Sequence, residues 1–232
     1  ISGLRRRGYT PKALKKFILS LGVAKREAIS DFNHLEHYIR EDLNLIAWRV
    51  MAVLNPIKLV IQNYPEDKVE FLDAENNPEN KSDGSRKIPF SRELYIEKED
   101  FIEDPPKKFF RLSVGREVRL KHGYYVKCTD IIKDNAGEIV QINCTYDPLT
   151  KGGWSNDGRK VKGTIHWVSL KHAINGEIRL YDRLFNKENP MDCENNLDFT
   201  SNINPNSIQS IHVAKLEPSL KEINFNKKFQ FL

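Results

Sequence analysis

The segment from Pro105 to Cys128 contains seven lysine or arginine residues and one acidic residue, Glu117. Arg119 and Lys121 alternate with apolar residues, so an extended strand would place the charges on one face and the aliphatic side chains on the other. Phenylalanines and tyrosines stand among these cations, and unstacked RNA bases dock against aromatic rings and planar guanidinium groups. Nucleic acid is therefore the first partner to consider. On composition alone, however, the pattern favours a solvated sheet face above an aromatic core, because most basic strands are only solvated faces.

Catalytic chemistry is not indicated elsewhere in the sequence, which has no phosphate-binding loop and no nucleophile elbow. His34 and His37 are three residues apart, but a pair of imidazoles without further ligands is more typical of core or surface histidines than of a metal site. His166 lies in an alternating segment and is interpreted as a packed or hydrogen-bonded strand residue. We therefore predict no catalytic residue and no metal ligand.

The composition places the protein among soluble proteins, with a net charge of +5 that permits a polyanionic partner. Cys128, Cys144 and Cys193 lack CxxC spacing, which predicts reduced thiols rather than zinc ligands or disulfides. No apolar run approaches the roughly 18 residues that span a bilayer, and no signal peptide is visible. We expect a cytoplasmic protein without a membrane partner. The start at Ile1 and the apolar end suggest a piece of a longer protein.

The N-terminal part has the periodicity of two helices. Thr10 is a suitable N-cap for the first helix, and Gly22 stands where a helix C-terminus is expected. Ser30 or Asp31 caps the second helix, whose apolar positions continue towards Val50.

From Asn55 and Pro56 onwards, short apolar segments separated by turn residues predict an all-β region. The predicted strands lie near residues 57–62, 68–72, 92–97, 108–114, 117–121, 124–132, 138–146, 160–169, 177–184 and 208–215. Loops are predicted at 73–86, 147–159 and 186–206. This spacing favours barrels over βαβ units.

Eight strings are more specific than any compositional argument. They are SGLRRRGYTP (2–11), IREDLN (39–44), MAVLNPIKLVIQNYP (51–65), GSRKIPFSRELYIEKEDF (84–101), GREVRL (115–120), DGRKVKGTIHWVS (157–169), EIRLYDRLF (177–185) and EPSLK (217–221). Together they resemble the C-terminal half of the glutaminyl-tRNA synthetases, which are class I enzymes. The alternative is the eukaryotic and archaeal glutamyl-tRNA synthetases, although KVKGTIHWVS looks more like the glutamine enzymes.

The resemblance implies a mainly β fold with a small N-terminal helical subdomain and two six-stranded anticodon-binding barrels of a kind also seen in a ribosomal protein. The helical connector would cover residues 1–53, the proximal barrel 54–157 and the distal barrel 158–232, with strands able to cross back to the proximal barrel.

The resemblance also implies partners and cofactors. The family attaches glutamine to tRNA(Gln) with ATP and Mg²⁺ in an N-terminal catalytic domain that carries HIGH-like and KMSKS-like motifs, and this sequence contains neither motif. We therefore expect no cofactor and no catalysis in the chain itself. Its expected partners are the anticodon loop of tRNA(Gln) and the parent protein's catalytic domain, and the expected state is a monomer.

Five family positions fall on the basic segment. Arg111 matches an arginine used on the third anticodon base, where guanine suits a bidentate guanidinium. Arg119 and Lys121 match a pair that reads the first base. The family often has arginine at Lys121, and lysine lacks the planar fork. Lys107 and Lys108 match positions that approach the loop.

Four further family positions lie outside the basic segment. Asn44 and Arg49 match residues that reach the anticodon loop, and the family pairs this arginine with a glutamine, here Gln230, around the middle base. Asn80 matches another loop contact, in a segment that differs by one residue. Without the resemblance, Arg49 reads as an electrostatic cap of a helix C-terminus and Asn44 as a turn former.

Two other functions stay open. The first is a free-standing barrel protein that binds ribosomal RNA by shape. The second is an interaction domain whose basic strand packs on an acidic protein partner.

Overall fold

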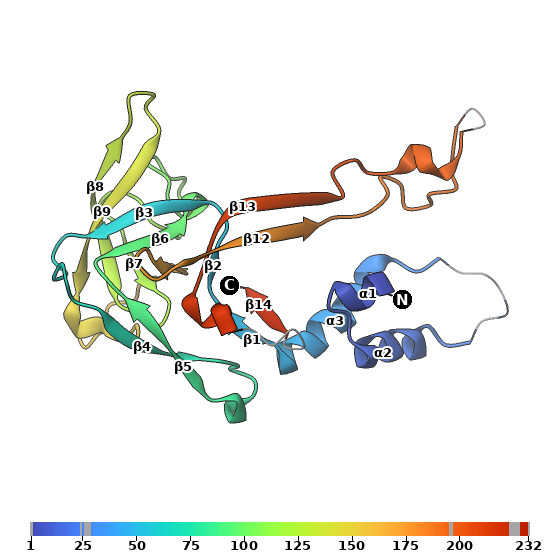
Figure 1. The fold of residues 1–232 in the computed structure, drawn as a ribbon, viewed down its shortest axis with the longest axis horizontal. Helices are drawn as coiled ribbons and strands as arrows, with labels where there is room; N and C mark the ends of the chain where they lie inside the picture. The colour runs from blue at the N-terminus through green and yellow to red at the C-terminus, as the bar shows by residue number, and fades with distance from the viewer. Residues whose placement is uncertain (1, 24, 26–28, 195–196, 223–227, 232) are drawn as a thin grey trace.

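Three helices precede a β-rich body in the computed structural model, which describes residues 2–23, 25, 29–194, 197–222 and 228–231 (Figure 1). The helices are α1 (Ser2–Arg6), α2 (Pro11–Leu21) and α3 (Phe32–Ile46). The predicted caps are confirmed: Thr10 Oγ1 accepts from the amide of Ala13 at 3.2 Å, and Gly22 follows α2 with φ +69°. Asp31, rather than Ser30, caps α3 by accepting from the amide of Asn33.

The predicted continuation of the second helix towards Val50 is wrong. Residues after Ile46 form two short strands, β1 (Trp48–Val50) and β2 (Ala52–Val53). β1 pairs in parallel with β14 (Phe229–Phe231), and β2 pairs with β13 (Ile208–Leu216). These partners lie more than 150 residues away in the sequence, so a local helical pattern loses to long-range strand pairing that it cannot reveal.

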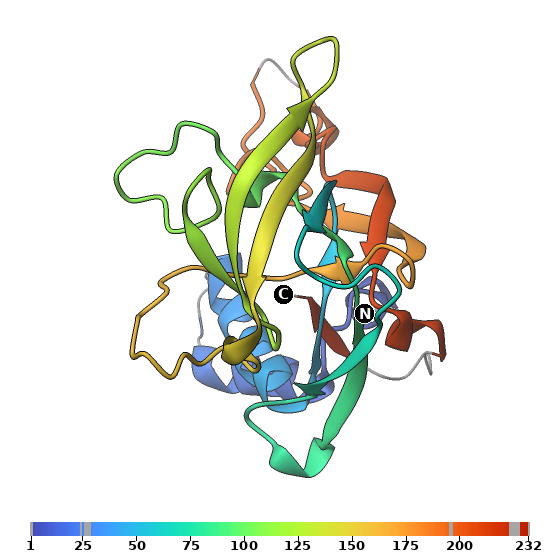
Figure 2. The ribbon, with the colours of Figure 1, turned by 90° about the vertical axis from the view of Figure 1, so that its left-hand side faces the viewer.

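The main sheet has seven strands in the order β10-β7-β8-β9-β3-β6-β11. The further strands that build it and its neighbours are β3 (Pro56–Ile61), β4 (Glu70–Glu75), β5 (Ser85–Phe90), β6 (Glu93–Glu97), β7 (Glu117–Leu120), β8 (Tyr125–Lys133), β9 (Ile139–Asp147), β10 (Thr164–Ile165), β11 (Val168–Ser169) and β12 (Ile174–Tyr181). The two edge strands, β10 and β11, are separated by only two residues. The sheet is therefore closed on itself through this short segment. Figure 2 shows the barrel with the yellow-green strands β8 and β9 towards the viewer.

The closing segment 164–169 counts as one interrupted strand, and on that count the barrel has the six strands that were predicted. The interruption lies at His166 and Trp167. Trp167 turns into the barrel, where it is 1% exposed, and donates its Nε1–H to the carbonyl of Lys121 at 2.9 Å. This segment belongs to the predicted distal barrel but closes the proximal one. The boundary at residue 157 stays a prediction.

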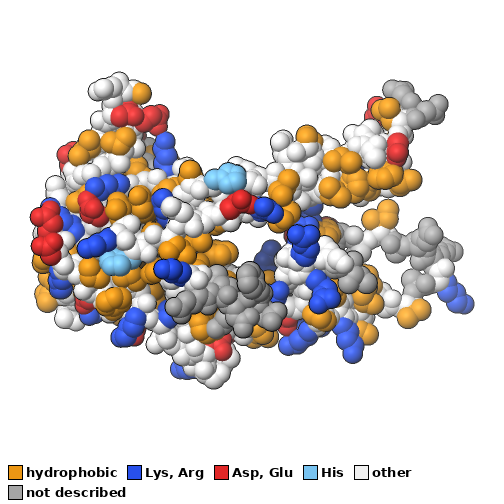
Figure 3. All heavy atoms as spheres, viewed as in Figure 1, with side chains coloured by type: hydrophobic (Ala, Val, Ile, Leu, Met, Phe, Trp, Pro, Cys, Tyr) orange, Lys and Arg blue, Asp and Glu red, His pale blue; other side chains and the backbone are white. Residues whose placement is uncertain are grey.

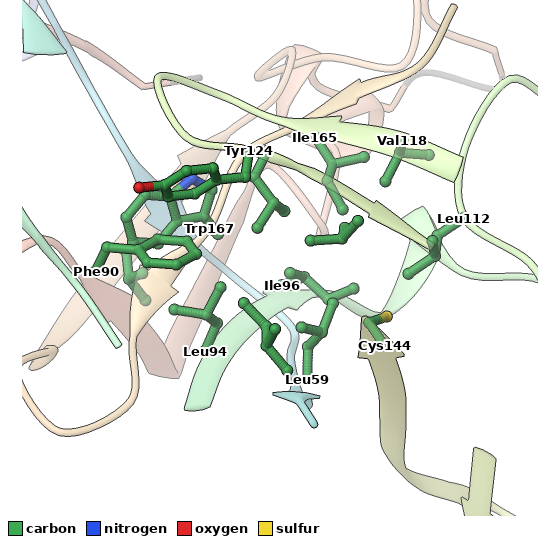
Figure 4. Close-up of a cluster of buried hydrophobic side chains, with 14 of the residues drawn as sticks. Leu59, Phe90, Leu94, Ile96, Leu112, Val118, Tyr124, Cys144, Ile165 and Trp167 are labelled. Atoms are coloured by element: carbon green, nitrogen blue, oxygen red, sulfur yellow. The ribbon is translucent and has the colours of Figure 1, made fainter. Parts of the chain in front are cut away.

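The barrel interior is filled by aliphatic and aromatic side chains from almost every strand of the sheet (Figure 4). The Phe90 ring packs edge-on against Trp167, with 5.0 Å between ring centroids, and Tyr124 lies 5.3 Å from Phe90. This packing fixes the inner face of β7 and thereby the direction of its outer face.

The predicted strand at 108–114 is wrong. Leu112 and Val114 form only isolated bridges, with Phe101 and Cys128, and the preceding residues make a turn in which Phe109 N donates to the carbonyl of Pro106. The Pro105–Pro106 pair supplies no backbone donors, so a regular ladder cannot begin there. The segment keeps its basic side chains but presents them from a loop.

Strand β5 lies partly in the predicted loop 73–86 and was not predicted. Pro89 argues against a strand in sequence reasoning, because proline cannot donate to a ladder. β5 pairs with β4 alone in a two-stranded sheet, so an edge position accommodates this proline.

The β12–β13 hairpin extends from the barrel towards the helices (Figure 1). Near its far end Arg183 Nη2 donates to Asn33 Oδ1 at 2.7 Å, and its guanidinium lies over the ring of Phe32. β12, β13 and β2 form an open sheet within the described residues. The mainly β fold after N-terminal helices is confirmed, whereas closure of a second barrel stays a prediction.

Candidate nucleic-acid interface

The outer face of β7 carries the predicted cations. Val118 and Leu120 are fully buried in the barrel, while Arg119 is only partly buried on the opposite face. Lys121 directly follows the strand. Its amide donates to the carbonyl of Ile165 at 2.9 Å, and its carbonyl accepts from the Nε1–H of Trp167. The alternation that the sequence indicated is confirmed, and the closing strand fixes its orientation.

Arg119 has no carboxylate or other hydrogen-bond acceptor for its guanidinium among the described residues, and its Nε is buried without a partner. The guanidinium carbon lies 5.8 Å from the ring centroid of Tyr125 and 5.7 Å from that of Trp154. Aromatic rings thus hold the side chain in place while its hydrogen-bond donors stay unused. Such a guanidinium is available to a ligand that offers planar acceptors.

Lys121 belongs to a second group of cations at the junction of the barrel and the N-terminal strands. Burial lowers the pKa of Lys121, and the nearby guanidinium groups of Arg49 and Arg86 lower it further. Burial, followed by the charges of Lys121 and Arg86, lowers the pKa of His122 to about 4. Glu217, 1% exposed, supplies a carboxylate here by binding Arg86 Nη2 at 2.8 Å. Lys121 thus lies near two guanidinium groups, of which Arg86 is paired with Glu217, and the excess positive charge attracts electron-rich groups.

Arg49 is buried at this junction. Its Nη1 donates to the carbonyl of Ala47 at 2.7 Å, and its Nη2 donates to the carbonyl of Asn44 at 3.0 Å. Both carbonyls lie at the C-terminal end of α3, so the guanidinium performs the helix-capping role that was the alternative interpretation. Gln230 lies opposite Arg49 in the β1–β14 register, and its buried Oε1 has no hydrogen-bond donor in the described part of the chain. The structure thus brings Asn44, Arg49 and Gln230 together.

Arg111 is paired with Asp100, which is 2% exposed. Burial raises the pKa of this carboxyl, against the opposing charge of Arg111. The Arg111 side chain is itself half exposed, so one side of the guanidinium is oriented by Asp100 and the other faces solvent. Such an arrangement holds a guanidinium ready for bidentate contact.

Two family models match this chain, both described as the anti-codon binding domain of class I tRNA synthetases (E and Q). They cover residues 47–147 and 164–232, which include the basic segment, the closing strand and the hairpin. The chain belongs to this synthetase family. The resemblance drawn from its short strings is thereby confirmed.

Relatives within this family are identical to the chain at about half of the aligned positions. A glutamine–tRNA ligase from Clostridium perfringens is 53% identical over 232 residues, and those from Clostridium kluyveri and Bradyrhizobium diazoefficiens are 49% and 51% identical over 231 residues. The matches cover 99–100% of this chain but only 41% of each relative. The chain therefore spans about two fifths of the length of these synthetases.

The remaining residues carried over from the family have different surroundings. Lys107 and Lys108 are fully solvent-facing in the turn before Arg111, as loop-approaching side chains would be. Asn80 caps a short 3₁₀ turn at the tip of the β4–β5 hairpin, where its Oδ1 accepts from the amide of Ser82 at 3.3 Å and its Nδ2 donates to Asp83. Its amide is occupied by this local turn.

Three residues of the interface were missed by sequence reasoning: Arg86, Glu217 and Asp100. Arg86 and Asp100 lie in the string GSRKIPFSRELYIEKEDF and Glu217 in EPSLK, so the strings that carried the resemblance also contained the signal. Their roles were hidden because each pairs with a residue distant in sequence, 131 positions away for Arg86 and Glu217. Composition cannot indicate such a pair.

Basic side chains also gather over the N-terminal helices, at the lower right of Figure 3. The guanidinium of Arg7, directly after α1, lies 4.9 Å from the ring centroid of Tyr181 on the hairpin. In the described part of the chain, no helix has the length and apolarity to cross a membrane, and no group of three or more acidic, histidine or cysteine side chains is arranged to hold a metal ion.

Proposed function

We propose that this chain is the anticodon-recognition module of a glutaminyl-tRNA synthetase, which attaches glutamine to tRNA(Gln) with ATP. The observation that carries the proposal is the set of side-chain donors without a partner among the described residues, on Arg119 in β7 and on Lys121 directly after it, in a chain of this family. Splayed anticodon bases offer acceptors on their Watson–Crick and Hoogsteen edges. A wrong base would leave buried donors unpaired and so be rejected.

The carried-over residues divide among the three anticodon bases. Arg119 and Lys121 would read the first base and Arg111 the third, where the O6 and N7 of a guanine match a guanidinium. Gln230 would serve the middle base, because its Oε1 lacks a donor that a base N–H supplies. Arg49 would hold that site by fixing the end of α3 rather than by direct contact.

The names of the relatives support glutamine over the glutamate alternative. We assign the ATP- and Mg²⁺-dependent step to the remainder of a parent protein, with its N-terminal catalytic domain as the intramolecular partner. A cytoplasmic, monomeric parent enzyme completes the proposal. Lys107, Lys108 and Asn80 would contribute contacts to the anticodon loop without reading a base.

The test is a titration of the chain with the anticodon stem-loop of tRNA(Gln), and with copies changed at single anticodon bases, at two salt concentrations. We expect base-dependent losses on top of a salt dependence whose logarithmic slope is about 0.7 per phosphate contact. Salt-sensitive binding that ignores the anticodon would instead support a shape-reading RNA-binding protein. The absence of salt-sensitive RNA binding would support an acidic protein partner. A glutamate stem-loop binding more tightly would favour the glutamyl-tRNA synthetases.

A further inference from the structure

Trp154 is a large aromatic side chain that the fold leaves in solvent. It is 76% exposed, whereas Trp167 is 1% exposed in the barrel. A single exposed aromatic side chain is ordinary on a protein surface, so the neighbours of Trp154 decide what it can do. The Trp154 ring centroid lies 5.7 Å from the guanidinium carbon of Arg119. The exposed ring therefore stands beside the guanidinium whose donors are unused.

The loop that carries Trp154 is held against the barrel at its start. Gly153 N donates to the carbonyl of Thr150 at 2.9 Å, and Thr150 Oγ1 accepts from the amide of Tyr125 on β8 at 2.9 Å. Gly153 has φ +85°, and a Cβ there would lie 2.6 Å from Arg119 Cδ. A side chain at this position would displace Arg119, so the loop passes as close to Arg119 as a glycine permits.

The far side of the same loop is held by Arg159. Its Nε donates to Glu117 on β7 at 3.1 Å, and its guanidinium also pairs with Asp147 and Asp157. Lys151, near the start of the loop, pairs with Glu70. These two cations are neutralised by carboxylates. Arg119 has no carboxylate partner among the described residues, so its guanidinium, beside Trp154, can bind an incoming polar ligand.

We propose that Trp154 is a stacking surface for the base that Arg119 reads, the first base of the anticodon. This inference rests on the proposed function. A nucleobase satisfies both neighbours at once, because its face covers the indole while its edge accepts from the guanidinium. An apolar protein surface would cover the indole but would bury the Arg119 donors without acceptors. The geometry therefore favours an RNA base over a hydrophobic partner.

The test measures the affinity of the chain for the anticodon stem-loop and for a copy that lacks the first anticodon base. Trp154→Ala should weaken binding of the intact stem-loop by about 5- to 100-fold, the range that one stacked base supports. It should change binding of the abasic copy by less than about 2-fold. Trp154→Phe should retain most of the affinity, because it keeps an aromatic face.

Leu149→Ala is the matched control, since Leu149 lies in the same loop and is 73% exposed. It should leave affinity unchanged, and neither variant should lower the melting temperature because both side chains are in solvent. A second readout is tryptophan fluorescence. The emission of Trp154 is the part of the signal that is missing in Trp154→Phe, and bound RNA should protect this emission from quenching by acrylamide.

The outcomes separate the two proposals. If the native chain distinguishes anticodon bases but Trp154→Ala binds every stem-loop as well as the native chain, the stacking role is wrong and the recognition module stands. If Trp154→Ala loses the same factor with the intact and abasic copies, Trp154 does not stack on the first base. If the native chain ignores all anticodon bases, the recognition module itself fails.

Discussion

Arg49 and Gln230 are direct partners in the parallel pairing of β1 with β14, yet the guanidinium of Arg49 donates to two carbonyls at the end of α3. Gln230 Oε1 is buried and has no donor within the ranges that the structure describes. The arginine thus joins the helical connector to the strand that precedes the barrel, and the glutamine carries the unused hydrogen-bonding capacity. We propose that the pair has divided roles, with Arg49 as the support of the site and Gln230 as the reader of the base.

Arg49→Ala should destabilise the fold as well as weaken RNA binding. The change leaves two carbonyls at the end of α3 without donors, and we expect the free energy of unfolding to fall by about 2–3 kcal/mol. Urea denaturation measures this loss. Arg40→Ala removes an exposed arginine from the same helix and should cost less than about 0.5 kcal/mol. A stable Arg49→Ala variant that has lost RNA affinity would contradict the capping role.

Arg111→Ala should relax preference at the third anticodon base alone, at a cost of about 1–3 kcal/mol in binding. It also leaves Asp100 buried and unpaired, so it should lower stability. The double variant with Asp100→Asn should regain stability without regaining discrimination. Stem-loop titration and thermal melting separate the two effects. Lys107→Ala is the control, and it should weaken binding to every anticodon about equally. An equal loss for all anticodons with Arg111→Ala would exclude base reading.

The elements that local physics determines were predictable from the sequence. The cap at Thr10, the glycine at Gly22 and the two-residue alternation of β7 depend on neighbouring residues only, and all three are present. The loop at 108–114 was not predictable, because its backbone is shaped by the residue that precedes the closing segment: a Cβ on Gly163 would clash with the carbonyl of Phe110. Contacts across such distances have no local pattern.

The same distinction applies to the candidate site. Arg119 and Lys121 could be selected because composition and alternation agree. Arg119 lies on the outer face of β7, and Lys121, directly after the strand, lies near Arg49 and Arg86 at the junction. Trp154 could not be selected, since the sequence of its loop indicates only polar turn residues and the contact of the indole with Arg119 depends on the fold. The charge balance at the junction was equally hidden, because it depends on Glu217, 131 positions from Arg86.

Glu217→Gln should be strongly destabilising. Glu217 binds Arg86 through two nitrogens and also accepts from the amide of Met51 at 2.9 Å, in a site where both charged side chains are at most 9% exposed. Glutamine would place an amide N–H₂ group against a buried guanidinium, and the loss of such a partner costs about 3–5 kcal/mol. Chemical denaturation measures it.

The control for Glu217→Gln is an exposed ion pair on the β4–β5 hairpin, which also carries Arg86. Lys87 follows Arg86 in β5 and binds Asp73 at 2.8 Å, with both side chains more than 60% exposed. Asp73→Asn should cost no more than about 1 kcal/mol. Similar losses in the two variants would show that burial of the Arg86–Glu217 pair does not set its contribution.

His122 should make the protein less stable as the pH is lowered from about 7 to about 4. The unfolded imidazole takes up a proton near pH 6.5, whereas burial, Lys121 and Arg86 keep the folded one neutral down to about pH 4. Over this interval the unfolded state binds more protons, so this group removes at most about 3 kcal/mol of stability, and below pH 4 its effect is constant.

His122→Asn removes the titration and tolerates the φ of +61° at this position. Its unfolding free energy should vary less with pH than that of the native chain. Parallel pH curves for His122→Asn and the native chain would mean that another group sets the acid sensitivity. His172, whose pKa burial and Lys171 also lower, would then be the next histidine to replace.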